Sequence, residues 1–194
     1  MPSLSRRQAL QLCVGTFAAT TGCAGETERD GPPDPAESEY TTDAESVSLR
    51  ASGPDPVLSY PDGEEPEFFE LLVTESGAAD LTFDREPDGT AAARSFVEAT
   101  QFDAESLFAA QDRIDECHTT ELAYLQQGSD DESPWPRFCR RTRPPDAECS
   151  VDAVDTQVAF VRIPTALDDP PRSYGYGSGG SCEPPRAGTE GGQQ

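Results

Sequence analysis

An excess of acidic over basic side chains limits what this chain can fold into more than any other feature of the sequence. Its 194 residues contain 37 Asp and Glu against 14 Lys and Arg, the formal net charge is -23, and only 35% of the residues are hydrophobic. Like charges on one compact surface repel and destabilise the folded state. At molar salt, however, the screening length falls to about 3 Å. A core this poor in apolar residues therefore depends on salt or on covalent cross-links.

The same composition excludes several functions. All basic side chains except one histidine are arginines, and lysine is absent, which removes the lysine of phosphate-binding loops and of Schiff-base enzymes. A strongly acidic chain is repelled by nucleic-acid phosphates, so no nucleic-acid partner is expected. Pairs of carboxylates occur throughout the sequence and therefore identify no general acid and base. The glycine-rich run 175–180 lacks a following lysine and is predicted to be a flexible loop.

The first 22 residues have the layout of an export signal. A polar start containing Arg6 and Arg7 precedes a charge-free, mostly apolar run from Leu10 to Ala19, and small residues follow, which is the order of a secretory signal peptide. The run is shorter than the about 20 apolar residues of a membrane-spanning helix. The paired arginines resemble a twin-arginine (Tat-type) signal, read by a receptor that moves folded cargo. Residues 1–22 are therefore predicted to be removed on export.

The end of this segment, Thr20 to Cys23, resembles a lipobox, in which the cysteine receives a lipid and becomes the new N-terminus. The resemblance implies that Cys23 carries acyl chains, each buried CH₂ of which contributes about 0.8 kcal/mol of membrane binding. The alternative is a simple cleaved signal in which Cys23 has no role.

Taken together, the acidic composition, the Tat-type signal and the lipobox resemble the exported lipoproteins of haloarchaea, most of which have no assigned function. The resemblance implies an extracellular protein anchored by its lipid to the outer face of the cell membrane. Its expected partners are the membrane and, beyond it, an envelope protein or a glycan.

Three regions follow the signal. Residues 23–45 are rich in acidic residues and proline and show no apolar periodicity, so they are predicted to form a disordered tether. Residues 46–182 are predicted to form one β-rich domain, and residues 183–194 a disordered tail.

Short apolar segments separated by Gly, Pro and Asp favour strands in the domain. A hairpin turn is expected at Ser76-Gly77, and residues 89–100 predict one short helix that Thr90 caps. The predicted fold is a mainly β, disulfide-stapled sandwich or open barrel with this helix. The expected strands are 46–52, 67–76, 78–83, 105–114, 118–126, 136–143 and 156–164.

The stretch from 105 to 164 has a resemblance of its own. "ESLFAAQ", a turn, "TTELAYL", an arginine-bearing strand ending at Pro144-Pro145, and then "VAFVRIP" are similar in layout to the C-terminal domain of PrcB protease-complex subunits. Where that domain has a Gly-Gly-Tyr element, this chain has Glu116-Cys117-His118. The resemblance implies an all-β arrangement.

Four cysteines follow Cys23, and an even set outside the cell predicts two disulfides, with three connectivities open from the count alone. A hairpin of 118–126 with 136–143, turning near Asp130, brings the first cysteine close to the third and leaves the second in mid-strand. The favoured pairs are therefore Cys117–Cys149 and Cys139–Cys182. Zinc bound by these thiols and His118 is the alternative, but the spacing lacks a close Cys-x-x-Cys pair, so no metal or other cofactor is expected.

Two further side-chain groups are candidates for binding. Arg137, Arg141 and Arg143 lie on one face of a strand and form a candidate anion site; the alternative is that they pair with the chain's own carboxylates. Three aromatic residues in proline- or glycine-flanked loops form either a sugar platform or the edge of the core. They are Trp135, Tyr174 and Tyr176.

The catalytic signals are few. A Ser-His-Asp triad has only His118 to draw on, and no Gly-x-Ser-x-Gly elbow is present. The predicted function is therefore that of a non-enzymatic binding or envelope-associated domain on the cell surface. The alternatives are an extracellular hydrolase, a thiol-redox protein and a metal carrier.

Overall fold

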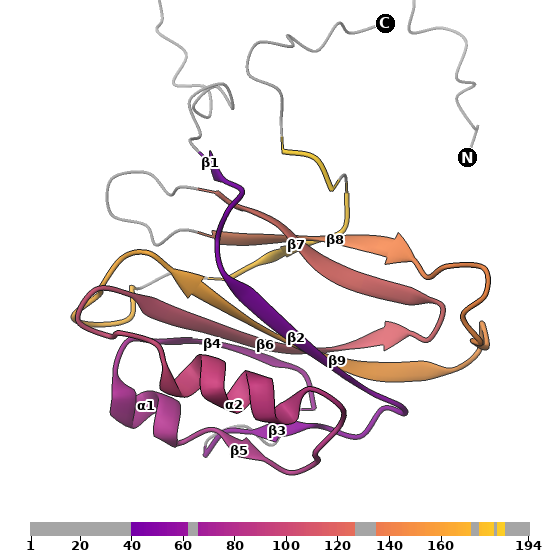
Figure 1. The fold of residues 1–194 in the computed structure, drawn as a ribbon, viewed down its shortest axis with the longest axis horizontal. Helices are drawn as coiled ribbons and strands as arrows, with labels where there is room; N and C mark the ends of the chain where they lie inside the picture. Colours follow the sequence, from indigo (N-terminus) through magenta and orange to yellow (C-terminus); the bar gives the residue numbers. More distant parts are fainter. Residues whose placement is uncertain (1–39, 62–65, 127–134, 172–174, 181, 185–194) are drawn as a thin grey trace, which may run out of the picture. The chain divides into compact units, whose positions relative to one another are not determined.

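The computed structural model describes residues 40–61, 66–126, 135–171, 175–180 and 182–184, and they form a mainly β domain (Figure 1). Its helices are α1 (Glu75–Ala79) and α2 (Thr90–Glu98). Its strands are β1 (Tyr40–Thr41), β2 (Ser46–Ala51), β3 (Leu58–Ser59), β4 (Phe68–Leu72), β5 (Thr82–Phe83), β6 (Ser106–Asp115), β7 (His118–Gln126), β8 (Trp135–Thr142), β9 (Val154–Ile163) and β10 (Gly177–Ser178).

The strands build two open four-stranded sheets, ordered β1-β7-β8-β10 and β2-β9-β6-β4, and a small β3-β5 ladder. The β2-β9-β6-β4 sheet is called the larger sheet, because its strands contain more residues. Figure 1 shows β7 and β8 on one side of the larger sheet and both helices on its other side. The predicted β-sandwich held by disulfides is confirmed. Helices α1 and α2 form a layer on the outer face of the larger sheet. The sequence predicted one helix and no such layer.

Alternation along β6 divides its side chains between two cores. Leu107 and Ala109 belong to the core shared with the helices, whereas Phe108 and Ala110 belong to the core between the two sheets. Because successive strand residues point to opposite faces, one strand supplies both cores, and its burial on both faces explains its apolar sequence.

A polar side chain fastens the β3 segment to the larger sheet. Gln111 of β6 is fully buried, and its Oε1 accepts hydrogen bonds from the N–H groups of Val57 and Leu58, each at 2.8 Å. Its Nε2 donates to the carbonyls of Leu58 and Pro66, at 3.2 and 2.9 Å. All of its hydrogen-bonding groups are thus satisfied, which a buried amide requires.

The predicted hairpin turn at Ser76-Gly77 is wrong, because helix α1 occupies this segment. The Thr74 hydroxyl accepts a hydrogen bond from the Gly77 N–H at 3.1 Å, the arrangement of a helix N-cap. Strand β5 consequently pairs with β3 rather than with β4, and the domain has a second helix.

Helix α2 confirms the predicted helix but not its cap. Its N-cap is Gly89, with φ of 91°, a left-handed conformation that favours glycine. The Thr90 hydroxyl instead donates to the Pro87 carbonyl at 2.7 Å. Thr90 is therefore the first residue of the helix and not its cap.

The domain extends further than its predicted limits. Tyr40 and Thr41, inside the predicted tether, pair with Gln126 and Leu125 of β7. The glycine-rich run is not simply a loop, since Gly177 and Ser178 form β10 and pair in parallel with β8. The predicted signal with Arg6 and Arg7, lipid site Cys23, turn at Asp130 and tail beyond 184 lie outside the described residues. No helix in the described part of the chain is long and apolar enough to cross a membrane.

Both predicted disulfides are present. Cys117 is bonded to Cys149, with the Cα atoms 5.2 Å apart, and Cys139 to Cys182, at 5.0 Å. The cause is the predicted hairpin: β7 pairs with β8 so that His118 lies opposite Thr142. The first cysteine therefore lies just beyond the hairpin end, while Cys139 remains in mid-strand.

Candidate functional site

At one end of the space between the two sheets, the facing side chains change from apolar to polar. On β7 and β8, the cross-strand pair Leu122 and Phe138 is followed by Thr120 with Arg140 and then His118 with Thr142. On β6, Asp112 follows Phe108 and Ala110 at strand spacing, and on β9 Gln157 precedes Ala159 and Val161. Four strands therefore contribute polar groups to the same end of the sandwich.

All of these polar groups except Gln157 line an open cleft of about 490 Å³, a volume in the range of small-molecule sites. The residues that line it, which we call the inter-sheet cleft, come from β6, β7, β8 and the segment at β10. They are Asp112, Arg113, Ile114, His118, Thr120, Arg140, Thr142, Ser178, Gly179 and Gly180.

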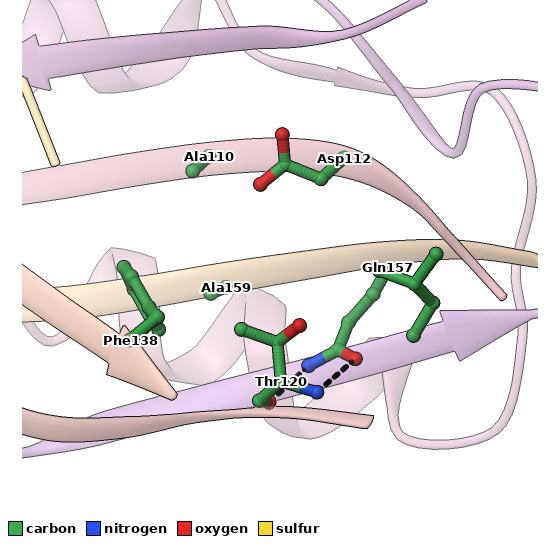
Figure 2. Close-up of a pocket in the computed structure, with 7 residues that line it drawn as sticks. Ala110, Asp112, Thr120, Phe138, Gln157 and Ala159 are labelled. Carbon is green, nitrogen blue, oxygen red and sulfur yellow. Dashed lines mark hydrogen bonds between the residues drawn. The ribbon is translucent and has the colours of Figure 1, made fainter. Parts of the chain in front are cut away.

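A much smaller cavity of about 10 Å³ adjoins the cleft and shares Asp112, Ile114 and Thr120 with it (Figure 2). This volume is about that of one water molecule. Figure 2 shows the Gln157 carboxamide reaching the backbone of Thr120: its Oε1 accepts from the Thr120 N–H at 3.0 Å and its Nε2 donates to the Thr120 carbonyl. Gln157 thereby joins β9 of one sheet to β7 of the other.

Asp112 is the carboxylate among the residues that line the cleft. Its Oδ1 accepts a hydrogen bond from the Tyr176 hydroxyl. Burial raises the pKa of the Asp112 carboxyl, the hydrogen bond from Tyr176 opposes this effect, and the charge of Glu67 adds to it. Burial and the adjacent Asp112 also raise the pKa of the Tyr176 phenol. A carboxyl with a raised pKa in a cleft marks a candidate functional site.

His118 lies at the mouth of the cleft beside an acid. Its Nδ1 is 3.5 Å from Asp115 Oδ2, which is longer than a hydrogen bond of usual strength, and Arg140 Nη1 is 3.1 Å from the same oxygen. The Nδ1 atom is buried and has no hydrogen-bond partner. Within the described ranges no hydrogen bond joins His118 to a hydroxyl group, so the triad that it would need is not assembled.

The predicted anion-binding arginines lie outside the cleft. On β8, Phe138 points into the core between the sheets. Arg137 and Arg141 are one and three residues away from it, so their side chains point to the opposite face, away from the other sheet. Arg137 Nε donates to Gln126 Oε1 at 2.8 Å, and Arg141 Nε is 2.6 Å from Glu121 Oε2. The alternative interpretation, pairing within the chain, describes Arg141.

The remaining arginines of this segment have different partners. Arg143 Nη1 donates to the Glu116 carbonyl at 3.0 Å, so it fastens the end of the hairpin. Arg140, which the sequence analysis did not choose, lies on the inner face and lines the cleft. Anion binding by the predicted set stays a prediction, whereas the arginines that line the cleft are Arg113 and Arg140.

The predicted aromatic platform is also divided. The Tyr176 ring packs within the core between the sheets, with its centroid 5.5 Å from that of Phe69 and 5.8 Å from those of Phe108 and Phe138. Trp135 is partly buried, and Tyr174 lies outside the described residues. The core-edge interpretation is therefore right for Tyr176.

Asp112 and Gln157 are site residues that the sequence analysis missed. The signal that was present is strand spacing: Asp112 follows Ala110 and Phe108 at intervals of two in the predicted strand 105–114, which places it on a core-facing side. Gln157 lies at the same spacing from Ala159 and Val161, so it is on the core-facing side of its strand as well.

No group of three or more His, Cys, Asp or Glu side chains that could hold a metal ion occurs in the described part of the chain. No protein family, no curated protein and no solved structure matches the chain.

Proposed function

We propose that this chain is a lipid-anchored cell-surface protein whose β domain is a non-enzymatic binding or envelope-associated module. The observation that carries the proposal is that all four cysteines after Cys23 are joined in two disulfides. Disulfides form and persist in oxidising compartments and are rare in the cytosol. The Tat-type signal 1–22 supplies the export route and Cys23 the anchor.

The inter-sheet cleft is the proposed binding site. It offers a carboxylate from Asp112, a guanidinium from Arg140 and the hydroxyls of Thr120, Thr142 and Ser178. Donors and acceptors of this kind fix the orientation of a polar ligand. Membrane anchoring would present the cleft to molecules of the cell envelope, either a protein or a glycan.

Localisation variants test the anchor. The full chain is expressed in a salt-loving archaeal host and the cells are separated into membrane, cytosol and medium. Cys23→Ser is expected to move the protein from the membrane to the medium or to block signal removal. The matched control is Cys13→Ser, which changes a cysteine inside the signal and leaves the protein in the membrane fraction. Equal distributions of the two variants, with the signal removed from both, would reject the lipid site.

Intact mass spectrometry without reducing agent tests signal removal, lipidation and disulfide formation. The expected mass is that of the chain from Cys23 onward plus lipid, minus four hydrogen atoms for the two disulfides. Replacing Arg6 and Arg7 by Lys is expected to leave the unprocessed chain in the cytosol. A native protein found in the cytosol with Met1 attached and its thiols reduced would overturn the proposal.

A hydrolase is the second candidate function, and one contact favours it. His118 Nδ1 lies 3.5 Å from Asp115 Oδ2, and Thr142 is the cross-strand partner of His118, so an imidazole and a hydroxyl group start from neighbouring backbone positions. Ester and glycoside substrates with chromogenic leaving groups test this candidate. Turnover that His118→Ala abolishes, while Arg141→Gln retains it, would establish it over simple binding.

A further inference from the structure

On the other face of the larger sheet, helices α1 and α2 enclose a groove of about 640 Å³, which we call the helix groove. It is separate from the inter-sheet cleft and shares no lining residue with it. Its floor is apolar and includes Leu81, Phe83, Val97 and Phe102, which pack on the core while staying partly exposed. A concave apolar surface of this size accommodates a hydrocarbon group.

The rim of the helix groove carries unpaired negative charge. Glu75, Glu98 and Asp103 line it, and none of them takes part in an ion pair with another described residue. The cation of the rim, Arg94, is already paired with Glu86 at 2.9 Å. Within the described residues, no ion pair compensates the charge of these three carboxylates.

Glu98 has an unfavourable position in its own helix. It is the last residue of α2, and no basic side chain lies in the last turn. The C-terminal end of a helix carries partial negative charge, so an acid there is destabilising and a cation is stabilising. The end of α2 already has a cation, because Arg162 of β9 donates from its Nη2 to the Phe96 carbonyl at 2.9 Å. The groups that remain to attract a ligand cation to the groove are therefore the carboxylates of Glu98 and Asp103.

The groove already shows how a cation is accommodated. The Arg94 guanidinium carbon lies 4.4 Å from the centre of the Phe83 ring, a cation–π contact. A ligand with an ammonium group would find the carboxylates of Glu98 and Asp103 and the Phe102 ring in the same groove.

We propose that the helix groove is a second binding site, which takes a small amphipathic cation: a protonated or quaternary amine attached to a hydrocarbon body. The body packs on Leu81, Val97 and Phe102, and the ammonium group lies by Glu98 and Asp103. The site goes beyond the proposed function, because it needs neither the lipid anchor nor the inter-sheet cleft.

The net charge of the chain attracts every cation, so the test is made where that attraction is screened. In molar KCl the screening length is about 3 Å, and only charges in contact with the ligand still contribute. A preference for cations that persists at molar KCl therefore reports the rim carboxylates rather than the charge of -23.

The first experiment compares three probes with the same hydrocarbon chain. The full protein in molar KCl is titrated by calorimetry with hexyltrimethylammonium, hexyl glucoside and hexanoate. We expect the cation to bind about tenfold more tightly than the neutral probe, given the usual strength of partly exposed charge and cation–π contacts, and the anion to bind most weakly. Equal affinity for the cation and the neutral probe, or no binding of the cation, would overturn the proposal.

The second experiment locates the site. Glu98→Gln combined with Asp103→Asn is expected to abolish the preference for the cation. The matched control is Asp146→Asn combined with Glu148→Gln, which removes the same charge from exposed positions outside the groove and is expected to keep the preference. All four side chains are exposed, so folding is retained, and near-UV circular dichroism verifies this. An equal loss in both variants would assign the preference to net charge and sink the proposal.

Discussion

Arg50 of β2 joins the two sheets at the end of the sandwich that holds the cleft. Its Nε is 2.7 Å from Asp155 Oδ2, and its Nη1 and Nη2 donate to the carbonyls of His118 and Glu116 at 2.6 and 2.8 Å. The Asp155 side chain is only 7% exposed. One guanidinium therefore neutralises a buried carboxylate and fixes the start of β7, where His118 enters the cleft.

Replacing Arg50 by Met is expected to destabilise the fold by about 3 kcal/mol, because removing one partner leaves a buried, unpaired charge. Arg141→Met is the control: its pair with Glu121 is half exposed and contributes at most about 1 kcal/mol. Guanidinium chloride unfolding at fixed KCl measures both. Similar losses in the two variants would show that Asp155 does not depend on Arg50.

Asp112 gives a pH-dependent prediction at the same scale. Burial raises the pKa of its carboxyl, so the folded chain binds the proton more tightly than the unfolded chain does. Ionised Asp112 therefore costs stability at neutral pH, and this cost disappears as the pH falls through the raised pKa. Asp112→Asn keeps an oxygen that can accept from Tyr176 but carries no charge, so it is expected to be at least as stable as the wild type at pH 7.

The measurement is the difference in unfolding free energy between the wild type and Asp112→Asn, taken at pH 7 and again near pH 3.8, the ordinary pKa of this carboxyl. The difference cancels the other carboxylates of the chain. The unfolding free energy of the wild type should rise relative to that of the variant at the lower pH. A difference that is independent of pH, or a variant that loses stability at pH 7, would contradict the assigned pKa direction.

At the scale of elements, the long strands are those that could be predicted from sequence. Strands β2, β6, β7, β8 and β9 have enough residues for alternation to register, and the β7–β8 hairpin determined both disulfides. The two-residue strands β1, β3 and β10 have no periodicity to detect. β10 also pairs with Arg137 and Phe138, far away in sequence, so only the folded chain places it.

Helix α1 was missed for a different reason. Ser76 and Gly77 are turn formers, yet Thr74 caps the segment and Glu75 lies in its first turn, which are helix-start signals. The two sets of signals compete within the four residues Thr74 to Gly77. The packing of Ala78 into the core shared with α2 favours the helix, and this packing is a tertiary contact that no local pattern contains.

The Cys139–Cys182 disulfide is expected to hold the segment of Tyr176 and β10 against β8. In the chain-entropy model, a closed loop of sequence separation 43 contributes about 4 kcal/mol. Replacing both cysteines by Ser should therefore lower the unfolding free energy by about that amount and weaken the near-UV signal of Tyr176, which packs on Phe138. The Cys117 and Cys149 double variant should lose similar stability while keeping the tyrosine signal. A tyrosine signal that survives in the first variant would show that core packing alone positions Tyr176.

At the scale of the whole molecule, the candidate sites depend on surfaces that the sequence hardly distinguishes. Asp112 is one of 37 acidic residues, and only its spacing from Phe108 and Ala110 along the predicted strand distinguishes it from the others. His118 was recognised because it is the single histidine, but its neighbour Arg140 was not, since selecting it required knowing which face of β8 is covered. The fold class follows from patterns along the chain, whereas the cleft exists only where four strand ends meet.

The net charge of -23 governs the salt dependence of the whole fold. Between 0.1 M and 1 M salt the screening length falls from about 10 Å to about 3 Å, so repulsion among surface carboxylates is largely lost over this range. The melting temperature is expected to rise steeply with KCl up to about 1 M and more slowly beyond it.

Salts that are excluded from the protein surface also strengthen apolar burial, so screening must be separated from that effect. Sucrose at matched osmolality strengthens burial without screening charge and should raise the melting temperature less than KCl does at pH 7. At about pH 4 the carboxylates are half protonated, the repulsion is weaker, and the advantage of KCl over sucrose should shrink. If KCl and sucrose stabilise the fold equally at pH 7, or if the advantage of KCl is the same at both pH values, charge repulsion is not what limits this domain and the disulfides and cores alone set its stability.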